Sequence, residues 1–285
     1  MKGQQDLTRE IIAANREFYN EYALEYEQFQ WYFRNEFEQR MWWREVKFIC
    51  RHLSGEPRVL DIGCGTGNLA LKFLHLGCQV IGVDISQNIL RVLASKVPSA
   101  SRARIQLINT ELDEFIDNSD DTFDVVAECS TLHHLPYYND FIDRITPLVK
   151  PGGFIYITQE PVHKNELAPS NTLSKITHKV IDGSQDCVIG IGSRLGLYRK
   201  TKAPDHTLAA YHYFKEGVSQ QPMLQSCEKN NISVIFNRRY NRRRMTLFSY
   251  IDNVLLGRLR LDRFQYTWFS MLLQRSKSHE HNSLS

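Results

Sequence analysis

An acid followed by three glycines at alternate positions is the part of this sequence best suited to chemistry. Residues 59–67 read VLDIGCGTG and begin with an apolar run. Because glycine lacks a Cβ, such a loop can turn tightly and bring its amide groups against a ligand. The apolar run predicts a buried strand before the loop, and the residues after it predict a helix whose first N–H groups are unpaired. A strand–loop–helix unit of this kind predicts the binding of a nucleotide-like ligand.

The charge of that ligand can be argued from the acids near the loop. A dinucleotide-binding loop has the form G-x-G-x-x-G, with an acid about 20 residues further on. Counted from Gly65, a looser form ending at Ala70 survives, and Asp84 lies where an acid would bind a ribose. Asp61, however, precedes the first glycine, and its carboxylate would repel a pyrophosphate and attract a cation. This favours S-adenosylmethionine, which carries an ammonium, a sulfonium and a ribose but no phosphate.

The elements around the loop alternate between strand and helix. The predicted strands cover residues 58–62, 79–83, 104–108, 123–127 and 154–158. The predicted helices cover 68–76, 139–149 and a segment from Ser86, a suitable N-cap, to Lys96. This alternation predicts a parallel sheet with helices on both faces. In such a sheet, ligands bind at the carboxyl ends of the strands, where the glycine loop and Asp84 are expected.

The segment before the loop, from about residue 8 to residue 53, is predicted to be helical because its aromatic residues recur every three or four positions. These residues are Phe18, Tyr22, Tyr26, Phe29, Phe33 and Phe37, followed by Met41. One interpretation is that they pack on the core. The other is that some of them cover a pocket, with Tyr19, Tyr26 and Trp31 as candidates because each also has a polar tip.

Beyond the fifth strand the alternation stops. Residues 161–213 have mixed polarity and scattered glycines and prolines, which predicts an insertion that covers a site. Further helices are predicted over 214–230 and 245–256, and strands over 232–240 and 266–275. The polar tail is predicted to be disordered.

In their order, these motifs resemble those of the class I S-adenosylmethionine-dependent methyltransferases. The resemblance covers roughly residues 45–160, with a fainter echo over 214–275. The glycine loop resembles the first motif of the family and residues 80–86 the second. Residues 107–115 resemble the adenine-edge segment, 123–135 the fourth-strand motif, and 148–153 the turn into the fifth strand.

The resemblance implies a Rossmann-like α/β fold with a seven-stranded, mostly parallel sheet and helices on both faces. An N-terminal helical cap and an insertion after the fifth strand would be added to it. The implied division is a cap over 1–53, a cofactor-binding core over 54–160, a substrate-covering insertion over 161–213, the C-terminal part of the sheet over 214–276, and a disordered tail over 277–285.

The resemblance also implies a set of residues that bind the cofactor. Asp84 would bind the ribose hydroxyls beside Ile85, and Glu111 with the Leu112 amide would read the adenine amino group. Cys64 would act through its backbone. The full set is Asp61, Gly63, Cys64, Gly65, Gly67, Asp84, Ile85, Glu111, Leu112, Glu128 and, from the aromatic stripe, Tyr26.

The catalytic candidates are His133, His134 and Glu160. A histidine after the fourth strand could accept the proton released when an oxygen or nitrogen is methylated. The alternative is that these histidines are packed at the start of a helix. Glu160 precedes a proline, which holds its backbone extended and would aim its side chain into the cleft.

The resulting hypothesis is a methyltransferase that transfers a methyl group in line from S-adenosylmethionine to an oxygen or nitrogen of a small molecule, leaving S-adenosylhomocysteine. No metal is expected. Two alternatives remain, namely an NAD(P)-dependent oxidoreductase that uses the looser glycine pattern and a non-catalytic protein that binds S-adenosylmethionine. The layout without an Asn/Asp-Pro-Pro-Tyr signature favours a small-molecule substrate over a nucleic acid.

Composition sets the remaining limits. The 285 residues are 42% hydrophobic and 24% charged, as in a globular protein, and no run has the length of a membrane span. Six dispersed cysteines without a C-x-x-C pair favour free thiols and a cytoplasmic location. A net charge of +3 is too small to indicate nucleic acid. A basic cluster over residues 238–263 has two interpretations, a nucleic-acid surface or a solvated or anion-binding face.

Overall fold

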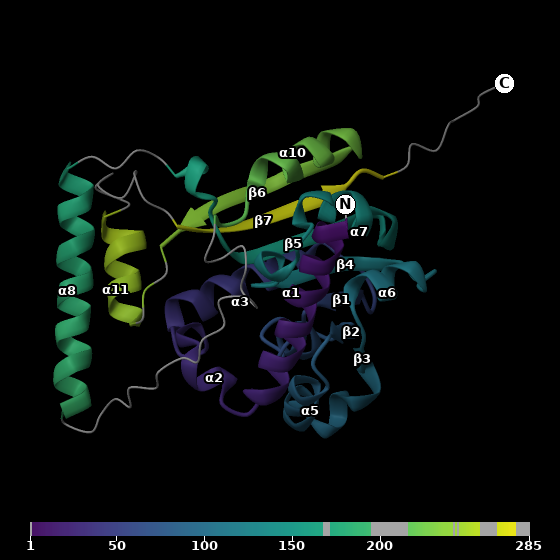
Figure 1. The fold of residues 1–285 in the computed structure, drawn as a ribbon. Helices are drawn as coiled ribbons and strands as arrows, with labels where there is room; N and C mark the ends of the chain where they lie inside the picture. Colours follow the sequence, from purple (N-terminus) through teal and green to yellow (C-terminus); the bar gives the residue numbers. More distant parts are fainter. Residues whose placement is uncertain are drawn as a thin grey trace.

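The computed structural model describes residues 2–167, 172–194, 216–241, 243, 245–256 and 267–277. Seven strands form one sheet in the order β3-β2-β1-β4-β5-β7-β6 (Figure 1). The strands are β1 (Arg58–Ile62), β2 (Gln79–Asp84), β3 (Ile105–Asn109), β4 (Phe123–Cys129), β5 (Val149–Pro161), β6 (Ile232–Tyr240) and β7 (Trp268–Arg275). Only β7 runs against its neighbours, β5 and β6, so the predicted seven-stranded, mostly parallel sheet is confirmed.

Helices cover both faces of the sheet. On one face lie α3 (Glu36–Arg51), α4 (Ala70–His75) and α5 (Gln87–Lys96), whose apolar residues share a core cluster with β1 and β2. On the other face lie α6 (Leu112–Asp117), α7 (Phe141–Ile145) and α10 (Gln220–Lys229), which share a second cluster with β4, β5 and β7. Because both faces are covered, the central strands are buried along nearly their whole length, which explains their continuous apolar runs.

The strand and helix predictions hold, with shifts at their ends. The five predicted strands of the first half and both later strands are present. The fifth strand is longer than predicted, since β5 begins at Val149 and includes the Pro-Gly-Gly turn. Ser86 caps α5 as expected, because its hydroxyl accepts a hydrogen bond from the Ile89 amide at 3.2 Å.

The segment over residues 8–53 is helical, as predicted, but it is divided into several helices. The segment forms α1 (Lys2–Glu21), α2 (Tyr26–Phe29), a 3-10 turn (Trp31–Phe33) and then α3. A new helix starts at α3 because the Asn35 side chain caps it, accepting hydrogen bonds from the amides of Phe37 and Glu38. The turn between the helices buries Tyr26 and Tyr32, whose hydroxyls are 2.9 Å apart. The aromatic residues therefore recur because they are buried where the chain folds back on itself.

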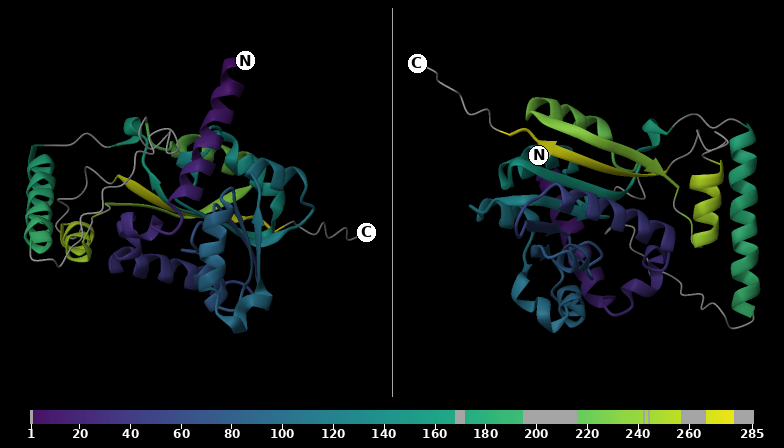
Figure 2. Two further views of the ribbon diagram at one scale, coloured as in Figure 1. Left: turned by 60° about the horizontal axis from the view of Figure 1, so that its bottom comes forward. Right: turned by 180° about the vertical axis from the view of Figure 1, so that it is seen from behind.

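The insertion contains a helix that the sequence did not predict, α8 (Thr172–Arg194). Its three glycines lower helix propensity by about 1 kcal/mol each, which weakened the helical pattern. In Figures 1 and 2, α8 stands at one side of the molecule next to α11 (Thr246–Tyr250), which is followed by a π-helical turn (Ile251–Leu256). Asp182 and Gln185 of α8 bond to Arg243 and Met245 before α11.

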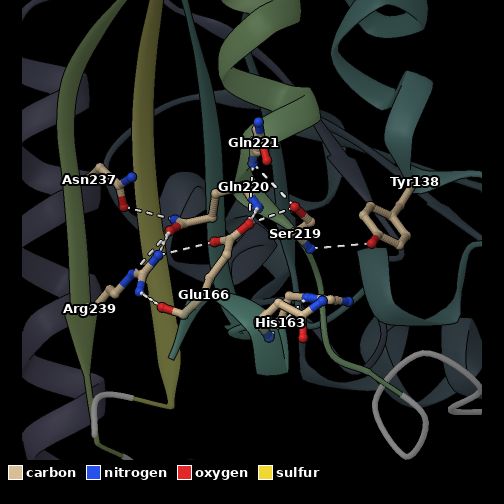
Figure 3. Close-up of polar contacts among 9 residues, drawn as sticks. Tyr138, His163, Glu166, Ser219, Gln220, Gln221, Asn237 and Arg239 are labelled. Carbon is tan, nitrogen blue, oxygen red and sulfur yellow. Dashed lines mark hydrogen bonds and ion pairs between the residues drawn. The ribbon is translucent and has the colours of Figure 1, made fainter. Parts of the chain in front are cut away.

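The chain between β5 and α10 is fastened by one carboxylate, Glu166. Its Oε1 accepts hydrogen bonds from the Ser219 hydroxyl at 2.6 Å and the Gln220 amide at 2.8 Å, at the start of α10 (Figure 3). Its Oε2 pairs with Arg239 of β6 at 3.1 Å. A carboxylate at a helix N-terminus is stabilising, so Glu166 joins this segment to both α10 and the sheet edge.

None of the described helices combines the length and apolar character that a bilayer crossing requires. The predicted disordered tail lies, from residue 278 on, outside the described residues.

Candidate cofactor and active site

A cleft lies over the carboxyl ends of β1, β2 and β4, where the sheet topology predicts a ligand. The space inside it, including the part that is open to solvent, is about 820 Å³. Ile62, Gly63 and Gly65 form its floor together with Asp84 and Ile85. A smaller hollow of about 290 Å³ continues from it past Asp61, Cys64 and Asn68; Tyr26, Gly63, Gly65 and Cys129 line both spaces.

Two glycines of the loop, Gly63 and Gly65, are needed for different reasons. A Cβ on Gly63 would lie 2.4 Å from the Thr131 hydroxyl, so this position must be glycine for the loop to pass under the chain after β4. Gly65 has φ +52°, and a Cβ added there would meet no atom closer than 3.9 Å, so this side of its backbone is open.

Asp61 is buried at the end of β1, with 1% of its surface exposed. One carboxylate oxygen, Oδ2, has no hydrogen-bond partner among the described residues, and Asp61 lines the smaller hollow. Burial, and to a smaller extent the carboxylates of Glu128 and Asp84, raise the pKa of Asp61 to about 8. An unpaired buried carboxyl is costly, and a cationic group bound against Oδ2 would remove that cost.

Asp84 lies at the end of β2 and faces the cleft from the opposite side of the loop. Its Oδ2 accepts a hydrogen bond from the Gly65 amide and its Oδ1 one from the Ser86 amide, both at 2.9 Å. Burial raises its pKa to about 6, although these amide bonds oppose the shift. The carboxylate is thus fixed in place beside the loop and still lines the cleft.

Glu111 and Leu112 follow β3 and line the far end of the cleft, as predicted for the adenine edge. Glu111, however, is already engaged, since Arg16 of α1 pairs with its Oε1 at 2.6 Å. This ion pair joins residues 95 positions apart in the sequence. Glu111, predicted to bind the adenine amino group, therefore also holds Arg16, and the sequence did not indicate this second contact.

Helix α1 covers the cleft. Ile12, Asn15 and Tyr19 lie on one face of this helix and line the cleft. Its last turn is attached to the start of α5, because the Asn20 side chain accepts hydrogen bonds from the Ser86 hydroxyl and the Asn88 amide. Of the aromatic candidates for a cover, Tyr19 and Tyr26 line the cleft, whereas Trp31 lies outside its lining.

The three catalytic candidates lie at two depths. His134 lines the cleft, and its Nε2 is 2.9 Å from the Tyr19 hydroxyl. His133 and Glu160 are buried and outside the cleft lining, and His133 Nδ1 lies 2.9 Å from Glu160 Oε2. The Glu160 side chain points at the chain after β4 and not into the cleft. The prediction that this side chain faces the cleft is therefore wrong.

Glu128 and Glu160 form a buried carboxyl pair behind this loop. Glu160 accepts hydrogen bonds from the amides of Leu132 and His133, and Glu128 accepts one from the Thr131 amide. Burial raises the pKa of Glu160 to about 8, and burial together with the charge of Glu160 raises the pKa of Glu128 well above its usual value. Two carboxyls in contact share a proton, and here they hold the loop backbone. Glu128, predicted to touch the cofactor, is among the residues that do not line either space.

Sequence reasoning missed the cleft residues of α1. Ile12 and Asn15 carried no motif, and only their spacing of three to four positions from Tyr19 could have indicated a shared face. Thr110 and Tyr137, which also line the cleft, lie beside motifs that were identified and could have been included.

The basic cluster is only partly described. Arg238 pairs with Glu45 at 2.7 Å, Arg239 with Glu166, and Arg243 with Asp182 and Asp252. These pairs favour a structural role for the three arginines. The other members, Arg242, Arg244, Arg258, Arg260 and Arg263, lie outside the described residues.

The donor groups around the cleft suit an organic cation. A buried acid with an open oxygen, a second acid held by amides, and a glycine loop together fit an aminoacyl nucleoside without phosphate. In the described part of the chain, no group of three or more His, Cys, Asp or Glu side chains has the arrangement of a metal site.

Comparison with known proteins agrees with this geometry. A family model of a methyltransferase domain matches residues 60–155. A ubiquinone biosynthesis O-methyltransferase of Albidiferax ferrireducens is 33% identical over 101 residues, which are 35% of this chain and 40% of that protein. The mitochondrial ubiquinone biosynthesis O-methyltransferase of Homo sapiens is 30% identical over 129 residues, which are 43% of this chain and 34% of that protein. The chain thus spans well under half of the length of these relatives.

Two solved structures share the fold. The magnesium protoporphyrin IX methyltransferase of Synechocystis PCC 6803, with bound S-adenosylmethionine, superposes with a TM-score of 0.55 at 13% identity, covering 93% of this chain and 97% of that one. The plantazolicin methyltransferase BpumL, in complex with S-adenosylhomocysteine, gives a TM-score of 0.53 at 12% identity, covering 96% and 99%. This chain therefore has the fold of the class I methyltransferases, and its residues 60–155 match the family model of a methyltransferase domain.

Proposed function

We propose that this protein is an S-adenosylmethionine-dependent methyltransferase that acts on an oxygen atom of a small molecule. The observation that carries the proposal is Asp61, a buried acid with an open oxygen at the end of β1. A pyrophosphate would be repelled there, whereas the ammonium of S-adenosylmethionine would complete the site. The two alternatives, a nicotinamide-dependent oxidoreductase and a non-catalytic binding protein, are not favoured by the methyltransferase domain match.

Each residue around the loop binds a different part of the ligand. Asp61 takes the ammonium, Asp84 takes the ribose hydroxyls, and the open backbone of Gly65 lies against the ligand between them. S-adenosylmethionine supplies a methyl group activated by a sulfonium. Holding acceptor and methyl group in line provides much of the rate enhancement that such a site can give.

His134 is the group proposed to receive the proton of the acceptor. An oxygen lone pair of the acceptor forms the bond to the methyl carbon, the carbon–sulfur bond breaks, and its electron pair stays on sulfur. The acceptor proton goes to the imidazole of His134, which lines the cleft and already bonds to a hydroxyl, that of Tyr19. Glu160 and His133 are positioning residues, because Glu160 accepts hydrogen bonds from the amides of the two residues before His134 and the His133 imidazole contacts the same carboxyl group.

Oxygen is preferred over nitrogen as the acceptor because both curated relatives are described as O-methyltransferases. The cleft is closed by α1 and is lined by Tyr19, Leu135 and Tyr137 near His134, which suits a compact, partly aromatic acceptor. We propose hydroxylated aromatic compounds as the first class to examine.

Calorimetric titration with S-adenosylhomocysteine and, separately, with NAD and NADP tests the cofactor assignment. We expect binding of S-adenosylhomocysteine and none of the nicotinamide nucleotides. The reverse result would overturn the proposal.

Incubation with methyl-labelled S-adenosylmethionine and a panel of phenols and catechols tests the activity. Labelled ether product is expected with the wild-type protein, and a loss of about 100-fold or more in kcat with His134→Ala. Binding of the cofactor without labelled product from any acceptor, including cell extract, would favour the non-catalytic alternative.

A further inference from the structure

The face of α1 that covers the cleft carries a polar side chain without a complete set of partners. Asn15 is 4% exposed and lines the cleft between Ile12 and Tyr19. Its Nδ2 donates a hydrogen bond to the carbonyl oxygen of Ile11 at 2.9 Å. Its Oδ1 has no hydrogen-bond partner among the described residues.

A buried carbonyl oxygen without a donor is uncommon in folded proteins, since it costs about 1–3 kcal/mol. The bond from Nδ2 to Ile11 fixes which end of the amide is free, because a flipped amide would bring its oxygen against the Ile11 carbonyl. The open atom at this position is therefore an acceptor, and it requires an N–H or O–H group from a ligand.

The position of Asn15 indicates which part of a ligand it meets. The next residue, Arg16, bonds to Glu111, which follows β3. Asn15 thus lies on α1 beside the end of the cleft formed by Glu111 and Leu112, and away from Asp61. In the proposed cofactor, the group with free N–H donors at that end is the 6-amino group of adenine, because the ribose hydroxyls belong to Asp84.

We propose that Asn15 Oδ1 accepts a hydrogen bond from the adenine 6-amino group, so that α1 takes part in nucleoside recognition as well as covering the cleft. The inference rests on the proposed function, since it assumes that the nucleoside is adenosyl. It gives a residue of the N-terminal cap a part in binding the nucleoside, which the sequence motifs of the core do not include. One oxygen of Glu111 is paired with Arg16, whereas Asn15 Oδ1 has no hydrogen-bond partner among the described residues.

The test compares two ligands that differ at this group and at the neighbouring N1, which carries a hydrogen in the inosyl ring. S-adenosylhomocysteine carries the 6-amino donor, whereas S-inosylhomocysteine carries a carbonyl oxygen in its place. The dissociation constants of both are measured by calorimetry for the wild type, Asn15→Ala, Asn15→Asp and Asn20→Ala. The ratio of the two constants is the readout, because changes in folding or in closure of α1 act on both ligands alike.

The wild type is expected to bind the adenosyl compound more tightly, and Asn15→Ala to reduce that preference about tenfold. Asn15→Asp keeps an acceptor oxygen and should retain a preference for the adenosyl ligand. Asn20→Ala removes the attachment of α1 to α5 but leaves Asn15 unchanged, so it should weaken both ligands and keep the ratio.

An unchanged ratio in Asn15→Ala would overturn the inference while leaving the cofactor assignment intact. Failure of the wild type to bind S-adenosylhomocysteine at all would instead overturn the proposed function. The two failures are therefore distinguishable in one experiment.

Discussion

At the scale of single residues, the candidate site is built from acids whose burial would be unfavourable without a partner. Asp61 has one open oxygen, and Glu128 and Glu160 are in contact below the loop after β4. The first of these arrangements serves a ligand and the second serves the backbone. Their titration should therefore separate binding from stability.

Asp61→Asn should weaken binding of S-adenosylhomocysteine by about 100-fold or more, because the ammonium would lose its only carboxylate in a buried site. The same change should raise the free energy of unfolding of the ligand-free protein. Burial raises the pKa of Asp61 to about 8, so the folded protein favours the protonated side chain. The stability of the ligand-free wild type that depends on this proton is therefore lost as the pH rises through about 8. Calorimetry and urea unfolding at pH 7 and pH 9 check both parts. A variant that is less stable than the wild type at pH 9 would contradict the argument.

Glu160 gives a second pH dependence. Its pKa in the folded state is about 8, above the ordinary value of 4.5, so its contribution to stability is complete below about pH 4.5 and is lost as the pH rises toward 8. Glu160→Gln cannot ionise, and its free energy of unfolding should fall less between pH 5 and pH 8 than that of the wild type. Urea titrations at several pH values measure the two slopes. Equal slopes would show that Glu160 does not titrate in this range.

The residues that could be predicted at this scale are those held by a local motif. Asp61, Gly63, Gly65 and Asp84 line the site because a strand, a glycine loop and the next strand end fix them together. Asn15 and Arg16 could not be predicted, because their position depends on a contact between residues 95 positions apart. Glu160 was predicted near the right loop but with the wrong direction, since β5 has an irregularity between Thr158 and Glu160, where Gln159 has φ +60°.

At the scale of elements, the site depends on how α1 lies across the sheet edge. Its polar attachments include the Arg16–Glu111 ion pair, the Asn20 bonds to α5 and the Tyr19 bond to His134, and its Ile11 and Phe18 side chains are buried. An exposed ion pair such as that of Arg16 contributes at most about 1 kcal/mol. The attachment of Asn20 to α5 can be tested by substitution.

Asn20→Ala should loosen α1 without unfolding the sheet. Loss of its bonds to Ser86 and Asn88 is expected to speed amide hydrogen exchange over residues 2–21 and to weaken S-adenosylhomocysteine about tenfold. Exchange in β1 and β4 serves as the internal control. Faster exchange throughout the sheet would mean that Asn20 stabilises the whole fold instead.

Glu166→Gln tests the other fastened element, the start of α10. The amide loses the pairing with Arg239 and part of the cap on α10, so the free energy of unfolding should fall by about 1–3 kcal/mol. Glu228→Gln, an exposed site on the same helix, is the matched control and should change stability by less than about 0.5 kcal/mol. Affinity for S-adenosylhomocysteine should stay unchanged, because Glu166 lies outside the cleft lining.

Element predictions succeeded for the strands and the helices that cover the sheet, and failed in the N-terminal segment and the insertion. The central strands β4 and β5 were recognised because burial on both faces gives a continuous apolar run. The break between α1 and α3 was missed because the same aromatic residues satisfy a helical repeat and a folded turn. Helix α8 was missed because glycines interrupt its pattern. The substrate-covering role of residues 161–213 remains a prediction, since the described part of that segment does not line the cleft.

At the scale of the whole molecule, the residues that line the cleft all come from the first half of the sequence. The floor of the cleft comes from β1, β2 and β4, and its cover comes from α1 and Tyr26. S-adenosylhomocysteine at 100 times its dissociation constant should therefore stabilise the entire folded unit by about 2.7 kcal/mol. A single shifted unfolding transition in scanning calorimetry is expected. Two transitions, with only one shifted, would indicate that the cover and the sheet unfold separately.

The placement of α1 has a practical consequence for anyone handling this protein. The helix that covers the cleft is the first described element, and Figure 2 shows its N-terminal end projecting from the body of the molecule. Any purification tag or fluorophore attached ahead of residue 2 is therefore carried on the helix that covers the cleft. A bulky tag there should perturb ligand exchange rates, whereas a small environment-sensitive dye would turn the same helix into an optical reporter of occupancy.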